Sequence, residues 1–223
     1  MPPLLLSRSA RRLRGLLAAG AAVIAFAAGA VPPEPATLLV VGDSLSAGYG
    51  IRVEEGWVAL LAHRLEEQAY GYRVVNASVS GETSLGALDR LPHLLERNRP
   101  SVVVLELGGN DGLRGLPTKD LEAHLNRMVE LCRAAGASVV LVGVAMPANY
   151  GPDYTAKFAA VYTGVAARYH LPFVRSLLEP LGADLANFQA DGIHPTAAVQ
   201  ARLVDYLWPT LAPVLAARRP ARR

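Results

Sequence analysis

Four short polar turns in this chain carry residue types that can perform acyl transfer. They lie at residues 42–45, 76–83, 108–111 and 191–195. Ser44 offers a hydroxyl nucleophile, which stays weak until a base removes its proton. His194 is the only histidine in a polar turn beside a carboxylate, that of Asp191. Because such a carboxylate can fix the imidazole tautomer, we expect Ser44, His194 and Asp191 to act as nucleophile, base and orienting group.

An oxyanion hole requires hydrogen-bond donors aimed at the position where negative charge develops. Gly81 has no side chain, so its backbone N–H can approach a substrate closely. Asn110 offers a side-chain NH₂ group, and the backbone N–H of Ser44 is a third donor. We therefore expect Ser44, Gly81 and Asn110 to form the hole.

Several of these residues also have structural interpretations. The Asp191-Gly192 pair can form an ordinary turn, with His194 capping the last helix. We interpret Asp43 as an acceptor for loop N–H groups. Glu106 interrupts an apolar strand, and a carboxylate there needs a partner, for which Arg114 is one candidate.

The elements that must position these turns alternate regularly. Apolar runs predict strands at residues 37–41, 72–77, 101–107, 138–144 and 172–174. Apolar positions at helical spacing predict helices at residues 56–69, 85–97, 118–135, 154–169 and 195–207. This alternation predicts one α/β domain, a parallel sheet between two helical layers. The carboxyl edge of such a sheet is where open α/β folds place their sites.

The order of the motifs resembles that of the SGNH (GDSL) hydrolase superfamily. Its four naming residues would here be Ser44, Gly81, Asn110 and His194. The runs at residues 42–49, 106–115 and 147–151 are similar to those of exported bacterial thioesterases, lysophospholipases and arylesterases, and the similarity extends over residues 37–210. The resemblance implies a flavodoxin-like, five-stranded α/β/α fold. It also implies hydrolysis of acyl-CoA thioesters, lysophospholipids and aryl or alkyl esters without a metal or cofactor.

Two other functions stay open at this point: a carbohydrate acetylesterase of the same superfamily, and a non-catalytic exported binding protein. Apolar side chains in the loops near the expected site favour a longer acyl substrate over acetyl. The substrate-binding residues that we expect are Leu113, Leu116, Met146, Tyr150 and Ile193.

Other functions disagree with the residues present. An α/β-hydrolase elbow needs glycine two positions after the serine, where Ser46 stands here. The glycines near residue 45 do not match a dinucleotide fingerprint. One cysteine and scattered histidines give no metal-ligand spacing. We therefore expect no metal and a small-molecule substrate.

The two ends of the chain are basic and the body between them is acidic. Residues 1–30 contain four arginines and no acid, so that 18 basic and 19 acidic groups follow them. A basic stretch, an apolar run and small residues at 28–30 predict a cleaved signal peptide over residues 1–30. We expect a periplasmic or secreted, monomeric domain at residues 31–223, with a frayed basic tail from about residue 216. We expect neither nucleic-acid binding nor stable membrane insertion, and the single cysteine, Cys132, should pack in the core.

Overall fold

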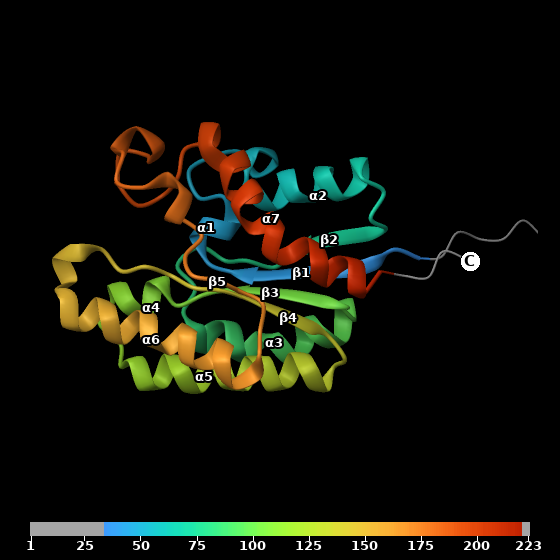
Figure 1. Ribbon diagram of the computed structural model, residues 1–223, viewed down its shortest axis with the longest axis horizontal. Coiled ribbons are helices and arrows are strands. Elements are labelled where there is room, and N and C mark those ends of the chain that lie inside the picture. The colour runs from blue at the N-terminus through green and yellow to red at the C-terminus, as the bar shows by residue number, and fades with distance from the viewer. Residues whose placement is uncertain (1–33, 220–223) are drawn as a thin grey trace, which may run out of the picture. The chain divides into compact units, whose positions relative to one another are not determined.

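The computed structural model describes residues 34–219, and the expected signal peptide and the last four residues lie outside this part. Five parallel strands form one sheet in the order β2-β1-β3-β4-β5 (Figure 1). The strands are β1 (Ala36–Gly42), β2 (Tyr72–Asn76), β3 (Val102–Glu106), β4 (Ser138–Val142) and β5 (Phe173–Val174). The predicted parallel sheet with helices on both faces is confirmed.

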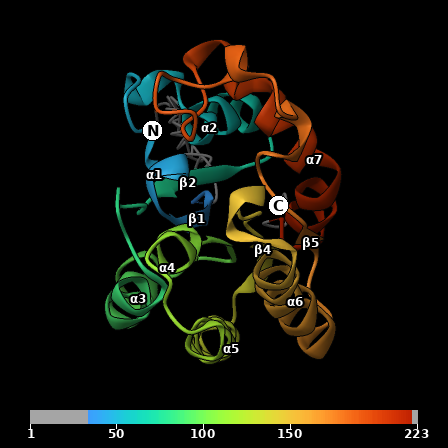
Figure 2. The ribbon, with the colours of Figure 1, turned by 90° about the vertical axis from the view of Figure 1, so that its left-hand side faces the viewer.

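Two separate hydrophobic cores cover the two faces of the sheet. Alternate residues of each strand point to opposite faces, so Leu38 and Val40 pack in one core while Leu39 and Val41 pack in the other. The first core contains α2 (Trp57–Glu67) and α7 (Gln200–Ala217). The second contains α3 (Ser84–Asn98), α5 (Thr118–Ala134) and α6 (Pro152–Tyr169). The end-on view shows these layers on either side of the strands (Figure 2).

The strand order places a crevice where the site was expected. The chain leaves β1 for β2 on one side of the sheet, and β3 then lies on the other side of β1. A crevice opens outside the carboxyl ends of strands at such a reversal. Ser44 follows directly after β1, at this reversal.

The sequence reading missed two short helices, α1 (Ser44–Ala47) and α4 (Gly109–Leu113), because four or five residues are too few to show helical periodicity. It also ended the last helix too early. That helix continues past Pro209 and Pro213 to Ala217, since Leu211 and Leu215 remain fully buried on its inner face. Single 3₁₀ turns lie at Val53–Glu55, Ala148–Tyr150, Glu179–Leu181, Leu185–Asn187 and Ala197–Val199.

Burial defines the environment of the single cysteine. Cys132 is fully buried on α5, as its helical spacing predicts, and this burial raises the pKa of its thiol to about 12. A thiol held neutral in this way is not a nucleophile at physiological pH. Over residues 34–219, no helix combines the length and the apolar character that crossing a bilayer requires.

Candidate active site

A sharp strand-to-helix turn presents Ser44 at the carboxyl end of β1. Ser44 is the first residue of α1, and the Asp43 side chain caps this helix by accepting from the Leu45 N–H at 3.1 Å. Gly42 is required for the turn, because a Cβ at this position would lie 2.7 Å from the Ser46 side chain. Asp43 therefore accepts a loop N–H, as expected from the sequence.

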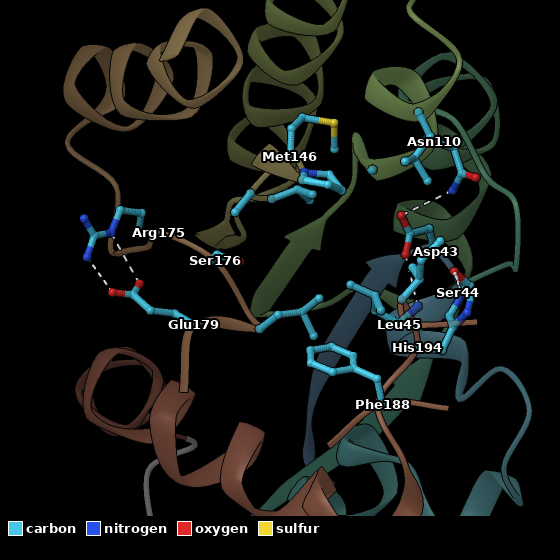
Figure 3. Close-up of a pocket in the computed structure, with 18 of the residues that line it drawn as sticks. Asp43, Ser44, Leu45, Asn110, Met146, Arg175, Ser176, Glu179, Phe188 and His194 are labelled. Carbon is cyan, nitrogen blue, oxygen red and sulfur yellow. Dashed lines mark hydrogen bonds and ion pairs between the residues drawn. The ribbon is translucent and has the colours of Figure 1, made fainter. Parts of the chain in front are cut away.

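Ser44, His194 and Asp191 form one hydrogen-bonded chain, and Figure 3 shows its Ser44 and His194 side chains next to each other. The His194 Nε2 atom lies 2.8 Å from the Ser44 Oγ, and the His194 Nδ1 atom lies 2.7 Å from the Asp191 Oδ2. A carboxylate accepts at Nδ1, so the proton of a neutral imidazole stays on that nitrogen and Nε2 is left free to accept from the serine. This arrangement lets His194 remove the Ser44 proton.

The turn that carries Asp191 and His194 also fixes the charge of the carboxylate. The Asp191 Oδ1 accepts the backbone N–H groups of His194 at 3.0 Å and of Ile193 at 2.9 Å. These bonds, the His194 N–H first, lower the pKa of Asp191 to about 2. Asp191 is therefore a carboxylate at neutral pH.

His194 is held from a side that sequence reasoning missed. The Tyr49 ring packs against the imidazole with 4.5 Å between the ring centroids. Gln189 connects the same two regions, because its side-chain NH₂ donates to the Tyr49 carbonyl at 2.8 Å and its backbone N–H donates to the His194 carbonyl. His194 is not the helix cap considered above, since the next helical turn begins at Ala197.

The three expected oxyanion donors come from three different segments: the start of α1, the loop after β2, and α4. The Asn110 side-chain NH₂ group, on α4, donates one hydrogen to the Asp43 Oδ2 at 3.3 Å, leaving its second hydrogen free. The loop after β2 runs beside the nucleophile turn, because the Val79 N–H donates to the Gly42 carbonyl at 3.1 Å. Within residues 34–219, the N–H groups of Ser44 and Gly81 have no protein acceptor.

Two buried carboxyl groups lie behind the nucleophile. Glu106 is fully buried, and its Oε2 lies 2.6 Å from the Ser46 Oγ. Burial raises the pKa of Glu106 well above its usual value, and the Asp43 charge raises it further. Burial likewise raises the pKa of Asp43 to about 6.

The expected ion pair between Glu106 and Arg114 is wrong. The Arg114 guanidinium instead donates to the Gly81 carbonyl. In place of pairing with a cation, Glu106 has a raised pKa, because burial without a charged partner disfavours the carboxylate form.

An apolar cavity of about 660 Å³ opens beside Ser44, Asn110 and His194. Its far end carries the ion pair between Arg175 and Glu179, on the opposite side from the serine (Figure 3). The remaining walls are mainly hydrophobic, with contributions from Leu45, Leu113, Val144, Met146, Leu178, Phe188 and Ile193. Within residues 34–219, no three His, Cys, Asp or Glu side chains are grouped to hold a metal ion.

The cavity includes three of the five expected substrate-binding residues, Leu113, Met146 and Ile193. Leu116 and Tyr150 do not line it. The Tyr150 ring is instead stacked on Tyr154, and its hydroxyl donates to the Leu113 carbonyl at 3.4 Å. Sequence reasoning missed the cavity residues Leu178 and Phe188, because the segment that carries them has no periodic apolar pattern.

Comparison with known proteins identifies the family of this chain. Residues 40–202 match the model of the GDSL-like lipase/acylhydrolase family. The chain is 52% identical over 179 residues to the esterase TesA of Pseudomonas aeruginosa, covering 80% of this chain and 89% of that protein. It is 39% identical to thioesterase 1/protease 1/lysophospholipase L1 of Escherichia coli, covering 80% of this chain and 85% of that protein.

Solved structures show the same architecture. A crystal structure of TesA superposes with a TM-score of 0.78 at 52% identity, covering 80% of this chain and 99% of that one. The esterase EstA of a Pseudoalteromonas species, inhibited by monoethylphosphonate, superposes with a TM-score of 0.77 at 37% identity, covering 80% and 98% of the two chains. The chain therefore belongs to the GDSL-like lipase/acylhydrolase family and is an ester-bond hydrolase of the SGNH superfamily.

Proposed function

We propose that this protein is an exported serine hydrolase that cleaves carboxylic esters and thioesters through an acyl-serine intermediate. The observation that carries the proposal is the hydrogen-bonded chain from Ser44 through His194 to Asp191, at the mouth of an apolar cavity. A nucleophile, a base and an orienting carboxylate in this order are the parts that acyl transfer requires.

The first half of the reaction acylates Ser44. The His194 Nε2 removes the hydroxyl proton as Ser44 Oγ attacks the acyl carbonyl, and the bond that forms makes a tetrahedral oxyanion. Asp191 stabilises the resulting imidazolium without taking its proton. His194 then gives the proton to the departing thiol or alcohol, and the bond between the acyl carbon and the leaving group breaks.

The second half of the reaction removes the acyl group from Ser44 and regenerates the free enzyme. Water attacks the acyl-serine while His194 accepts one of its protons. As the second tetrahedral species collapses, the bond between the acyl carbon and Ser44 Oγ breaks, His194 gives its proton to Oγ, and the acid is released. In both halves the backbone N–H groups of Ser44 and Gly81 and the Asn110 amide donate to the oxyanion. Such preorganised donors act most strongly where charge develops.

The cavity supports acyl groups longer than acetyl. Its hydrophobic walls would remove several methylene groups from water, and each fully buried methylene contributes about 0.8 kcal/mol. The relatives are named as an esterase and as a thioesterase and lysophospholipase. We infer that acyl-CoA thioesters, lysophospholipids and aryl or alkyl esters are the substrate classes of this chain.

A substrate panel tests the proposal: acyl-CoA, lysophospholipid, aryl esters from acetyl to octanoyl, and an acetylated sugar. We expect kcat/KM on the aryl esters to rise by more than about tenfold from acetyl to octanoyl, at about twofold per carbon in an open groove. Ser44→Ala should hydrolyse none of them. A steady fall from acetyl onward, with turnover of the acetylated sugar, would instead identify a carbohydrate acetylesterase.

Export rests on residues 1–30, which lie outside the described part. A basic region followed by a short apolar run is typical of a secretory signal. The mature protein should begin near Val31, in the periplasm of a Gram-negative host. N-terminal sequencing of the exported fraction checks this, and cytoplasmic protein that still begins at Met1 or Pro2 would contradict it.

A further inference from the structure

The turn that carries Gly81 is bonded to α4, the helix that carries Asn110. The Arg114 Nη2, just after α4, donates to the Gly81 carbonyl at 2.9 Å. Asp111 accepts the Ser84 backbone N–H at 2.8 Å, and its other carboxylate oxygen accepts from the Ser84 hydroxyl. These bonds attach the turn to α4 at Gly81 and at Ser84.

Gly81 needs such an anchor more than most residues do. Its φ is +80°, in the left-handed region that favours glycine. Glycine has the broadest choice of backbone conformations, so its own covalent geometry does little to fix the direction of its N–H. A bond to its carbonyl anchors the peptide unit that follows Gly81 and so limits the conformations from which the turn presents the Gly81 N–H.

Arg114 and Asp111 differ in how they hold the turn. Asp111 is 3% exposed and caps the buried start of α3, so it contributes to the fold. Arg114 is exposed, and among the described residues it forms no ion pair with a carboxylate. The one hydrogen bond of its side chain there is to the Gly81 carbonyl. An exposed side chain with this single contact is not needed for packing.

We propose that Arg114 is a positioning residue for the oxyanion hole. Its guanidinium holds the Gly81 N–H in line with the Asn110 amide, so that two donors from separate loops reach one oxyanion. This inference rests on the proposed function. It gives Arg114 a role in the oxyanion hole without contact to substrate or nucleophile, because Arg114 acts through Gly81 alone.

The test compares Arg114→Ala and Arg114→Lys with a matched control, Tyr154→Phe, in the mature protein. The Tyr154 hydroxyl donates to the Gly112 carbonyl at 3.1 Å, so the control also loses one hydrogen bond to α4 but none to the Gly81 turn. The measurements are kcat and KM on an aryl butyrate and the inactivation rate with a fluorophosphonate, whose tetrahedral adduct also places an oxygen in the hole.

Misalignment of one donor should cost less than its removal, so Arg114→Ala should lower kcat by about tenfold, with KM within about twofold of wild type. Phosphonate inactivation should slow by a similar factor. Because a lysine ammonium can also donate to the Gly81 carbonyl, Arg114→Lys should recover most of the loss. Millimolar guanidinium should partly restore the alanine variant, and Tyr154→Phe should match wild type.

Three results would overturn the inference. They are an Arg114→Ala kcat within about twofold of wild type, an equal loss in Tyr154→Phe, and a higher KM at unchanged kcat. The last would make Arg114 a substrate contact. Failure of the proposed function is separate, because it would appear in the wild-type protein as absence of both ester hydrolysis and phosphonate labelling.

Discussion

Three carboxyl side chains lie around Ser44, and their surroundings shift their pKa values in opposite directions. Asp191 lies in a surface turn, where N–H donors lower its pKa to about 2. Asp43 and Glu106 lie beneath the serine, where burial raises both pKa values, that of Asp43 to about 6. The comparison teaches that hydrogen-bond donors and desolvation, rather than residue type, decide which carboxylate can stabilise an imidazolium.

The substitution with the largest expected effect is Asp191→Asn, which tests whether the Asp191 carboxylate orients and stabilises His194. The amide keeps the shape of the side chain but removes the charge, and it can present an N–H to the His194 Nδ1, which selects the wrong imidazole tautomer. We expect kcat to fall by about 10⁴-fold on an aryl ester. A loss below about tenfold would mean that Asp191 does not orient His194.

Asn110→Ala tests the role of the amide that is bonded to the buried Asp43. Asp43 accepts one hydrogen of the Asn110 amide and so directs the other away from itself. Removal of one oxyanion donor should lower kcat by about 10²–10³-fold with the fold intact by circular dichroism. A variant within about threefold of wild type would remove Asn110 from the oxyanion hole.

Two leucines near the cavity test whether its lining decides the preference for acyl chain length. Leu113 and Leu116 are each 39% exposed and lie three residues apart, but only Leu113 lines the cavity. Leu113→Ala should reduce the preference for octanoyl over acetyl esters by about fivefold, because it shortens an apolar wall by three carbons. Leu116→Ala is the control and should leave the chain-length profile unchanged. Equal effects of the two substitutions would show that the substrate contacts the outer loop instead.

Glu106→Gln should have the smallest effect on catalysis and is the matched partner of Asp191→Asn. Burial favours the neutral form of Glu106, and this form loses no charge on becoming an amide, so kcat should stay within about twofold of wild type. A large loss would mean that Glu106 acts as a carboxylate.

The same variant makes the pH dependence of stability testable. Because the pKa of Glu106 is raised on folding, the folded protein binds more protons than the unfolded chain above about pH 4.5, and wild-type stability falls as pH rises. Glu106→Gln lacks this loss, so its advantage in urea unfolding should grow from pH 4.5 to neutral pH. Asp191 has the opposite sign: its stabilisation is present above pH 3.8 and is lost as pH falls towards about 2.

The sequence predicted the strands and the proximity of Ser44, His194 and Asp191 for physical reasons. Strands covered on both faces leave uninterrupted apolar runs, and β3 is fully buried along its length. Ser44 and His194 stand in short motifs whose local turns present their side chains. These features depend on neighbours in sequence.

What the sequence did not predict depends on contacts between distant residues. The partner of Glu106 is Ser46, 60 residues away, and Gln189 bonds to Tyr49 across 140 residues. The last helix passes Pro209 because tertiary burial of Leu211 and Leu215 outweighs the missing backbone hydrogen bond. The spacing of apolar residues along the sequence does not predict contacts of this kind.

The identity of the nucleophile is tested most directly by peptide mapping after reaction with a fluorophosphonate. Ser44 is the serine whose hydroxyl lies 2.8 Å from the His194 Nε2, so the label should be found on Ser44 and should be absent from Ser44→Ala. Ser46, whose hydroxyl is bonded to Glu106, should stay unlabelled. A label found mainly on Ser46, Ser78 or Ser80 would contradict the assignment.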